Sequence, residues 1–421
     1  MGYVGLCSAV GLALAGHDVI VVGRTQSKIE SINKGKSPIF EEGLDEALAK
    51  LLAQGKFSAT SDIAKAVEAS DLTFICVGTP SAEDGSIDLT DIKKASEDVG
   101  KALTGKQGHH IIIVKSTVVP GTTEQCAIPI IEASSGKKAG KDFGVCMNPE
   151  FLREGKALED FMKPDRVVIG EFDKESGDVL EGVYSSFNAP VVRVPLKTAE
   201  MIKYASNSFL ATKISFMNEV ANLCKKLGID VYDVAKGMGH DKRIGHRFLN
   251  AGVGFGGSCF PKDVSALIHL AKKSGSKADL LETVMSVNEK QKRKIVDILK
   301  SKLDLKGKKI AILGLAFKDG TDDIRDAPSV EVLNELLKSG AHVSAYDPKA
   351  AENMRRVFPN VSYAKSAGEA LTGADACLIM TEWPEFAKLT DKDFSAMKGK
   401  IVIEGRRLLD KSRAKFEGVC W

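Results

Sequence analysis

The sequence predicts an α/β fold with two doubly wound domains joined by a helical middle domain that contains a long central helix. Short β-branched runs alternate with helical segments up to about residue 195, and the alternation restarts after residue 290. Between these parts lies a long run with neither glycine nor proline. Dividing the 421 residues by the roughly 150 of a typical domain also gives two or three domains. We therefore expect domains at 1–195, 196–290 and 291–421.

The first part begins with an apolar segment, residues 1–16, whose Ala13-Leu14-Ala15 imitates a signal-peptide cleavage site. Apart from His17, the first basic side chain is Arg24, so the basic region of a signal peptide is absent. The segment is instead predicted to be a helix packed inside an α/β domain. Helices follow at Thr25–Lys34 and Leu89–Leu103. Buried parallel strands are predicted at Val19–Val22, Leu72–Val77, Ile111–Val114, Gly144–Met147 and Val167–Ile169.

The middle part starts after Pro195, and the run from Leu196 to Leu227 predicts one helix of about 45 Å. Such a helix suits a spine between two domains and could also form a dimer interface. The third part repeats the pattern of the first, so both ends of the chain are predicted to be Rossmann-like. Its elements are strands at Lys308–Leu313, His342–Tyr346, Ala376–Met380 and Ile401–Ile403 and a helix at Val330–Lys338.

Composition narrows the function classes. Apolar residues make up 43% and charged residues 27% of the chain, as in ordinary globular proteins, and the net charge is only +3. So small a basic excess gives no indication of nucleic-acid binding, and no apolar run approaches the roughly 18 residues of a membrane span. The eight cysteines form no Cys-x-x-Cys pair, and no histidines show metal-ligand spacing. We expect a cytoplasmic protein with reduced thiols and no metal, nucleic-acid or membrane partner.

Two glycines at the start, Gly2 and Gly5, match the last two positions of a dinucleotide-binding fingerprint, in which glycines let the backbone approach a pyrophosphate. The strand and the first glycine that should precede them are absent, so the pair could equally be turn and helix-packing residues. If the fingerprint is genuine, the first strand of the N-terminal sheet is missing, which indicates a misplaced start site or a truncated chain.

The strand that ends at Val22 is followed by Gly23, Arg24 and Thr25, where NAD-binding proteins normally carry an acidic residue for the ribose 2′-hydroxyl. Without that carboxylate a 2′-phosphate is not repelled, and Arg24 offers it a fork-shaped donor. The segment therefore favours NADP or dual use. The alternative is that Arg24 is solvated or stacks on adenine.

Polar segments follow two further predicted strands, Gly78-Thr79-Pro80 and Ser116-Thr117. Both would lie at strand carboxyl ends, where open sheets bind ligands. Each segment, taken alone, is more often an ordinary turn.

Two pairs of polar residues stand four apart. On a helix, Glu150 and Glu154 would share a face, although a solvated helix start is the default interpretation. Lys203 and Asn207 lie on the predicted long helix and together could hold a developing oxyanion. An exposed lysine and a helix-surface asparagine are the alternative.

The sharpest local feature is the glycine-rich segment from Gly252 to Asp263. Pro261 suits the first turn of a helix, so Cys259 would sit at a helix N-terminus near Lys262, which favours the thiolate. An electropositive, glycine-lined cysteine is a candidate nucleophile. The alternative is a buried structural cysteine in a turn.

Together these segments resemble the nucleotide-sugar dehydrogenases of the UDP-glucose/GDP-mannose dehydrogenase family, most closely the UDP-glucose 6-dehydrogenase branch. The resemblance spans nearly the whole chain, from Gly2 to Asp410. The stretches that carry it are GYVGL, SPIFEEGL, VGTP, KSTVVPGT, NPEFLREGKALEDF, KYASNSFLATKISFMNE, DKRIGHRFLNAGVGFGGSCFPKD, GLAFKDGTDDIRDAPS and IEGRRLLD.

The resemblance implies a two-step, four-electron oxidation of UDP-glucose to UDP-glucuronate with NAD, or NADP as the alternative given Gly23. Cys259 would form a thiohemiacetal and then a thioester, and the other catalytic residues would be Lys203, Asn207, Asp263, Thr117 and Glu150. Substrate-binding positions would be Phe151, Leu152, Arg153, Glu154, Asn250, Gly254, Phe317, Lys318, Arg406 and, from across a subunit interface, Arg243. Cofactor-binding positions would be Gly2, Tyr3, Val4, Lys28, Thr79, Glu154 and Arg325, to which the segment after Val22 adds Arg24 and Thr25 on its own chemistry.

Three points stay open at this stage. The sugar could be that of GDP-mannose or a UDP-N-acetylhexosamine, although Arg243-Ile244-Gly245 and the FLNAGVGFGG run favour UDP-glucose. A nucleotide-sugar-binding protein, inactive through loss of the first strand, is a non-enzymatic alternative. The long helix and Arg243 make a homodimer the expected assembly.

Overall fold

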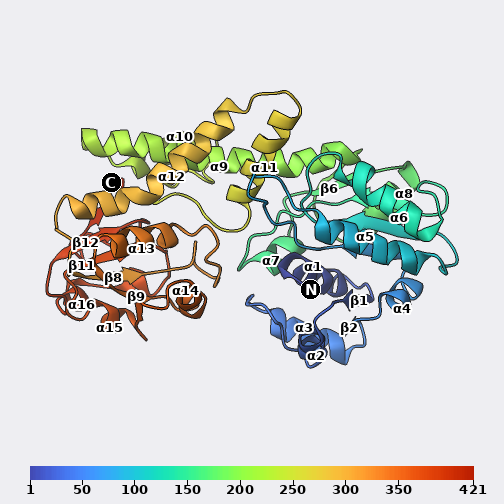
Figure 1. The fold of residues 1–421 in the computed structure, drawn as a ribbon, viewed down its shortest axis with the longest axis horizontal. Helices are drawn as coiled ribbons and strands as arrows, with labels where there is room; N and C mark the ends of the chain where they lie inside the picture. Colours follow the sequence, from blue (N-terminus) through green and yellow to red (C-terminus); the bar gives the residue numbers. More distant parts are fainter. The chain divides into compact units, whose positions relative to one another are not determined.

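The computed structural model describes residues 1–421, which form two compact units, residues 1–206 and 207–421 (Figure 1). Helix α9 (Leu196–Leu227) begins in the first unit and ends in the second, and its bounds confirm the predicted long helix. The division into three domains stays a prediction. None of the helices combines the length and apolarity that crossing a bilayer requires.

The first unit opens with a small parallel sheet. Helix α1 lies almost entirely in the core, with Leu6 and Val10 packed among Ile32 and Leu44, so the prediction of a packed helix is confirmed. Strands β1 and β2 pair in register from Val19–Phe57 onward. The elements are α1 (Tyr3–Leu14), β1 (Val19–Val22), α2 (Gln26–Asn33), α3 (Leu44–Ala53), β2 (Phe57–Thr60) and α4 (Ile63–Glu68).

A five-stranded sheet of order β3-β4-β5-β6-β7 completes the first unit. Alternate residues of β4 enter different cores, Ile112 and Val114 on one face and Ile111 and Ile113 on the other. This two-sided burial explains the continuous apolar runs. The elements are β3 (Leu72–Ile75), α5 (Thr90–Leu103), β4 (Ile111–Val114), η1 (Thr123–Ala127), α6 (Ile128–Ser135), β5 (Gly144–Met147), α7 (Ala157–Met162), β6 (Val167–Glu171), α8 (Lys174–Val183) and β7 (Val191–Pro195).

One predicted strand runs the other way. The sequence predicts that all strands here are parallel, but β6 pairs antiparallel with β5, with Cys146 opposite Glu171. The prediction is wrong because residues 148–166, with only the short α7, do not cross the sheet and β6 begins at the edge where β5 ends. The 148–155 segment therefore stays at the carboxyl edge of β3, β4 and β5.

The strands of the first unit divide between two sheets, because β1 pairs only with β2 while β3 pairs with β4. The sheet of the second unit has the uninterrupted order β10-β9-β8-β11-β12-β13, in which the first strand, β8, lies between the second and the fourth. That is the doubly wound order predicted for the third part of the chain.

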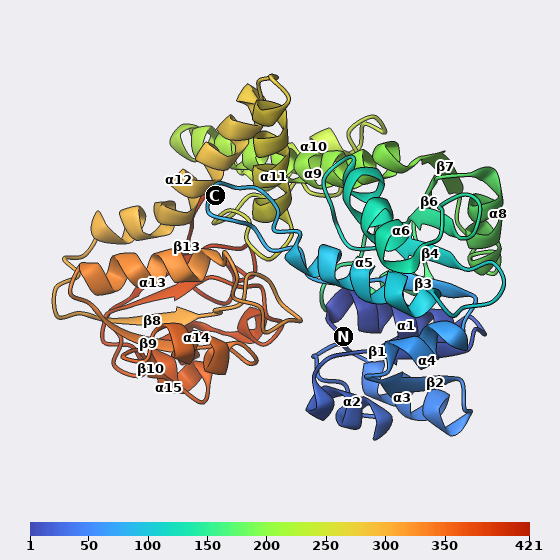
Figure 2. The same ribbon diagram turned by 45° about the vertical axis from the view of Figure 1, so that its right-hand side comes forward.

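In the second unit, all the strand pairs of this sheet are parallel. Helices α13 and α15 cover opposite faces (Figure 2), and β8 sends Ile310 and Ile312 into one core and Ala311 and Leu313 into the other. The elements are α10 (Val231–Gly239), α11 (Phe260–Lys273), α12 (Asp279–Lys300), β8 (Lys309–Leu313), α13 (Pro328–Lys338), β9 (His342–Tyr346), α14 (Ala351–Val357), β10 (Ser362–Tyr363), α15 (Ala367–Leu371), β11 (Ala376–Ile379), η2 (Phe386–Lys388), α16 (Asp391–Phe394), β12 (Ile401–Glu404) and β13 (Glu417–Gly418).

Candidate active site

Three parallel strands of the first unit end at one edge, where Ile75 of β3, Val114 of β4 and Met147 of β5 are in register. The segments 78–80 and 116–117 come shortly after β3 and β4, as predicted. Because the carboxyl ends of parallel strands share one edge, both segments lie there with the loop that follows β5.

The predicted residues Glu150 and Lys203 form a buried ion pair. Lys203 Nζ donates to Glu150 Oε1 at 2.9 Å, and the two side chains are only 4% and 6% exposed. The Leu152 N–H donates to the other carboxylate oxygen at 2.6 Å. Burial by itself would raise the pKa of Glu150, but the Lys203 ammonium, the Leu152 N–H and the charge of Lys115 together hold the pKa below its usual value. The interpretation of Lys203 as an exposed lysine is therefore wrong.

The segment that carries Glu150 is not helical. Helix α7 begins only at Ala157, so Glu150 and Glu154 do not share a helix face and that expectation is wrong. One local contact opposes a helix here: the Glu150 carboxylate accepts the N–H of Leu152, which in a helix would point back toward the carbonyl of residue 148.

The two loops after β3 and β4 are fastened to each other. Ser116 Oγ donates to the Val77 carbonyl at 2.8 Å and accepts the Val77 N–H at the same distance. Thr79 Oγ1 donates to the Thr117 carbonyl at 2.8 Å. Thr117 itself is half-buried, so its hydroxyl stands in a fixed loop at the edge that also carries Glu150.

Aromatic stacking orients the next residue, Phe151. The Arg166 guanidinium lies 3.7 Å from the Phe151 ring centroid, and Lys203 Nζ lies 5.4 Å from it. Arg153 is exposed and bound to Asp160 through its backbone N–H and its side chain. Leu152 and Glu154 are both half-buried.

Three of the predicted cofactor residues, Gly2, Tyr3 and Val4, form the start of α1. Gly2 is the N-cap of this helix, so no side chain caps the first-turn N–H groups. A side chain at Gly2 would meet nothing within 4 Å. The Tyr3 hydroxyl donates to Glu41 and accepts the Gly155 N–H, which ties the helix to the 151–156 loop. Open space before uncapped first-turn N–H groups, including that of Val4, fits the pyrophosphate of a dinucleotide.

The end of β1 carries no acidic residue. Gly23 is buried, and a side chain there would collide with the Met1 side chain. Arg24 is exposed and pairs with Asp91 at 3.1 Å, while Thr25 and Lys28 are exposed. The site thus fits a dinucleotide but offers no carboxylate from Gly23 to a ribose.

In the second unit, Asp263 is the centre of the predicted catalytic group. Asn207 Nδ2 donates to Asp263 Oδ2 at 2.6 Å, and Lys262 Nζ donates to Oδ1 at 2.6 Å. Asp263 is 1% exposed. Asn207 is buried too, so its interpretation as a helix-surface residue is wrong. Both carboxylate oxygens accept hydrogen bonds, which fixes the Asp263 side chain. The second N–H of the Asn207 amide is not used in this contact.

The predicted position of Cys259 at the N-terminus of a helix is confirmed. Cys259 is the N-cap of α11, and Pro261 lies in the first turn. The side chain is half-buried, and Ser258 Oγ lies 3.7 Å from its Sγ. A cysteine in this position receives the positive end of the helix dipole.

Three buried amide side chains hold the glycine-rich loop. Asn218 Oδ1 accepts the Gly252 N–H at 2.8 Å, and Gln291 donates to the Gly252 carbonyl at 2.6 Å. Asn288 makes the same two contacts with the backbone of Phe255, at 2.8 and 3.0 Å. The three amides are at most 2% exposed, so the loop that leads to Cys259 is rigidly supported from α9 and α12.

Two glycines of this loop have left-handed backbones, Gly254 at φ 91° and Gly257 at φ 83°. A side chain at Gly257 would strike the Phe317 ring at 2.8 Å, so glycine is required on both counts. Arg406 donates to the Gly254 carbonyl at 2.5 Å, and Lys318 lies 5.9 Å from the Phe317 ring. The structure thus brings four predicted substrate residues together around one loop.

The remaining predicted residues of the second unit are peripheral to that loop. Asn250 is exposed. Arg243 pairs with Asp241 while its side chain stays 89% exposed. Arg325 binds Asp323 and accepts the Gly257 N–H on its carbonyl at 2.8 Å. Of these three residues, Arg325 is the one whose backbone is hydrogen-bonded to the glycine-rich loop.

Comparison with known proteins identifies the family over almost the whole length. Residues 1–188 match the NAD binding domain of the UDP-glucose/GDP-mannose dehydrogenase family, residues 197–290 its central domain and residues 311–411 its UDP binding domain. The chain belongs to this family. It is a nucleotide-sugar dehydrogenase that uses NAD, with a nucleotide-sugar substrate.

Individual relatives are similar end to end. A UDP-glucose 6-dehydrogenase of Haloferax volcanii is 45% identical, with 97% of this chain and 96% of that protein covered. A GDP-mannose 6-dehydrogenase of Pseudomonas syringae pv. tomato is 40% identical, with 100% and 98% covered. The solved structure of a UDP-glucose dehydrogenase from Pyrobaculum islandicum superposes with a TM-score of 0.94 at 44% identity, covering 100% of this chain and 96% of that one.

Several supporting residues of this dehydrogenase were not predicted from its sequence. Lys115 and Glu200 are buried charges, and the loop-holding amides lie on α9 and α12. Glu200 accepts the N–H groups of Gly121 and Thr123 and the Thr123 hydroxyl. Lys115 does belong to the KSTVVPGT stretch, and Asn218 to the KYASNSFLATKISFMNE stretch. The other residues carry no local signal, because their partners are distant in sequence.

Proposed function

We propose that this dehydrogenase oxidises UDP-glucose at C6, first to the aldehyde and then to UDP-glucuronate. The observation that carries the proposal is the pairing of each predicted catalytic carboxylate with a predicted oxyanion donor, Glu150 with Lys203 and Asp263 with Asn207. Four residues of different types in two matched pairs are not expected of a decayed enzyme. The 45% identical UDP-glucose 6-dehydrogenase supports the choice of sugar.

Covalent chemistry at Cys259 explains how one site performs two oxidations. Its Sγ adds to the aldehyde carbon and the carbonyl oxygen takes a proton, which gives a thiohemiacetal; loss of a hydride and a proton then leaves a thioester. NAD, when bound, supplies the hydride acceptor for both oxidations. Water cleaves the thioester to the carboxylic acid and restores the thiol.

The protein stabilises charge and moves protons in these steps. Lys203 and Asn207, one turn apart on α9, each retain N–H donors beyond the one given to a carboxylate and would hold the oxyanion. Glu150 would accept the proton of the hydrolytic water, and Asp263 and Thr117 would position water for proton transfer. On the substrate side, Lys318 and Arg406 would neutralise the diphosphate.

We propose that the first turn of α1 would hold the cofactor pyrophosphate, and that Gly23 and Arg24 let the enzyme accept NADP as well as NAD. The supporting observation is that Arg24 is bound only through an exposed ion pair with Asp91, which a 2′-phosphate can replace. The ratio of kcat/KM for the two cofactors should therefore shift toward NAD in Arg24→Ala.

We also propose a homodimer formed through α9. Phe209, Phe216 and Leu223 are spaced seven apart on this helix and are 64%, 52% and 57% exposed, a stripe that water does not favour. Arg243 would reach the partner's substrate. Light scattering should give twice the chain mass, and Phe216→Glu should give the single-chain mass.

The first experiment counts reduced cofactor per UDP-glucose by absorbance, separately with NAD and NADP. Two per sugar supports the four-electron reaction, and Cys259→Ser should abolish the second oxidation; full activity in that variant would remove the covalent role. GDP-mannose and a UDP-N-acetylhexosamine serve as competing substrates. Binding of UDP-glucose with no reduction of either cofactor would favour a binding protein instead.

A further inference from the structure

One buried charge in the first unit has no place in the chemistry above. Lys115 follows β4 and is 3% exposed. Its ammonium donates to Asn148 Oδ1 at 2.8 Å and lies 5.8 Å from the Phe161 ring centroid. No carboxylate lies within ion-pair distance of this ammonium, although burying an unpaired ammonium is expensive. Burial lowers the pKa of Lys115 to about 8.

Asn148 is the residue through which Lys115 reaches the loop that carries Glu150. Its Oδ1 also accepts the Tyr184 hydroxyl at 2.6 Å, and its Nδ2 donates to the Val168 carbonyl at 2.8 Å. The Asn148 amide is thus held by the residue after β4, by β6 and by the residue after α8. Only Pro149, whose φ is fixed, separates it from Glu150. Where Asn148 is placed therefore decides where Glu150 is placed.

Lys115 also acts on Glu150 through its charge. Lys203 on α9 is its direct partner, Cys76 after β3 faces the same region, and Lys115 acts on Glu150 through space. Glu150 in turn raises the pKa of Lys115, while Lys203 lowers it. Two ammonium groups thus share one buried carboxylate. The Cys76 thiol does not supply a second negative charge near neutral pH, since burial raises its pKa to about 11.

We propose that Lys115 is a positioning residue for Glu150: through Asn148 it fixes the turn that carries this carboxylate, and its positive charge stabilises the carboxylate in the ionised form. The proposal rests on the function proposed above for Glu150. It explains why the protein keeps an ammonium beneath the loop where a neutral side chain would be easier to bury.

The test compares Lys115→Met with Lys115→Arg and Tyr184→Phe. Rapid quenching and intact mass measurement follow the decay of the covalent Cys259 intermediate against pH. In Lys115→Met the acid limb should move up by about one pH unit, because a nearby positive charge is lost, and the plateau rate should fall about tenfold. Lys115→Arg should keep the acid limb of the wild type. Tyr184→Phe removes a hydrogen bond to Asn148 but no charge, so its plateau should fall without a shift. An unmoved acid limb in Lys115→Met would overturn the proposal.

A second measurement needs no turnover and no methionine variant. In protein labelled with ¹³C at the lysine Cε, the Lys115 signal, assigned by its absence in Lys115→Arg, should titrate near pH 8. Because coupling between two sites is reciprocal, Glu150→Gln should move that titration to lower pH. An unchanged titration would contradict the proposal. If the titration moves but the wild type forms no covalent intermediate, the proposed reaction fails while the link between Lys115 and Glu150 stands.

Discussion

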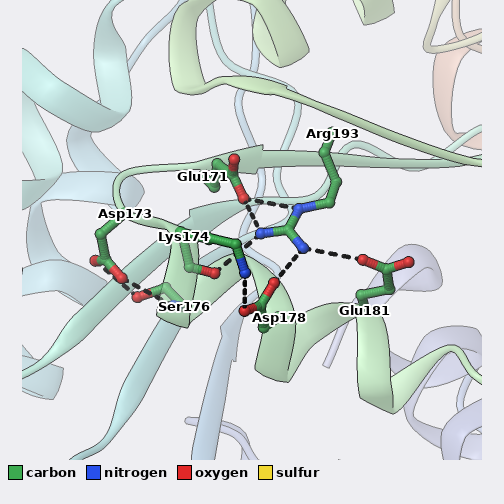
Figure 3. A network of polar contacts seen from close by, with 7 residues as sticks. All are labelled: Glu171, Asp173, Lys174, Ser176, Asp178, Glu181 and Arg193. Carbon is green, nitrogen blue, oxygen red and sulfur yellow. Dashed lines mark hydrogen bonds and ion pairs between the residues drawn. The ribbon is translucent and has the colours of Figure 1, made fainter.

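Two charge networks of the first unit differ in burial and, with it, in what they do. In the first, Arg193 of β7 binds Glu171 of β6 and Asp178 and Glu181 of α8 (Figure 3). These four side chains are 23–47% exposed. In the second, the Glu150–Lys203 pair and Lys115 are almost completely buried. We call these the Arg193 network and the Glu150 cluster.

Water accounts for the difference. In the Arg193 network it screens every charge, so three carboxylates can share one guanidinium at little cost, and the contacts join strand to helix. In the Glu150 cluster there is no such screening, so each charge depends on the others, and the pKa values of Glu150 and Lys115 are both lowered. Buried clusters of this kind are where protein pKa values can be set for chemistry.

Removing one partner of the buried pair should have the largest effect. Lys203→Met leaves Glu150 buried without its direct counter-charge and removes a proposed oxyanion donor, so kcat should fall about 1000-fold. Unfolding should become easier by about 3 kcal/mol, measured by urea titration. Lys197→Met is the matched control, because Lys197 lies on the same helix but is 52% exposed, in a pair with Glu124. Equal losses of kcat and of unfolding free energy in both variants would contradict the proposed difference between buried and exposed ion pairs.

Two buried carboxylates should respond to pH in opposite directions. Glu150 has a folded-state pKa below its usual value, so its ionisation stabilises the fold at neutral pH and this contribution is lost as the pH falls through that pKa. Glu200, which has only hydrogen-bond donors for partners, has its pKa raised by burial. Its contribution to stability therefore decreases as the pH rises through that pKa.

The substitutions Glu150→Gln and Glu200→Gln should separate these two contributions to stability. The melting temperature of Glu150→Gln should fall less steeply than that of the wild type on acidification below about pH 5. Relative to the wild type, Glu200→Gln should gain in melting temperature as the pH rises toward neutral. Parallel curves for both variants would show that the ammonium groups do not govern Glu150.

The Arg193 network should contribute stability alone. Arg193→Met should lower the free energy of unfolding by about 1 kcal/mol, and the loss should shrink in high salt because the charges are exposed. Activity should stay within about twofold of the wild type, since none of the residues in Figure 3 belongs to the proposed site. A large loss of kcat would show that this network influences the loop that carries Glu150.

The sequence predicts the fold best where the local pattern determines the structure. Helix α9 and strands β1, β4, β5 and β9 have the predicted bounds, because β-branched runs and the lack of glycine and proline act locally. Strands β2 and β7 were not predicted: each is only partly buried, and β7 ends in Pro195. The direction of β6 depends on the path of the preceding connection, which no local pattern encodes.

The candidate site divides in the same way. Its catalytic residue types could be assigned by resemblance, and Pro261 predicts the helix start at Cys259. The burial of Lys203 and the contacts of Lys115 could not be predicted, because they depend on strands and helices far apart in the chain. The roles assigned to these residues stay predictions.

The smallest expected effect tests whether the Arg193 network depends on each of its charges. Lys174 is 82% exposed, and its ammonium pairs with Asp178 four residues along α8. Its carbonyl, however, accepts an Arg193 N–H at 2.9 Å, and Lys174→Ala keeps that carbonyl. The melting temperature should therefore change by less than about 1 °C, since exposed pairs at this spacing add little. If calorimetry instead gives a loss as large as that of Arg193→Met, the ammonium is an integral part of the network. Exposure would then be no guide to which charges of this unit matter.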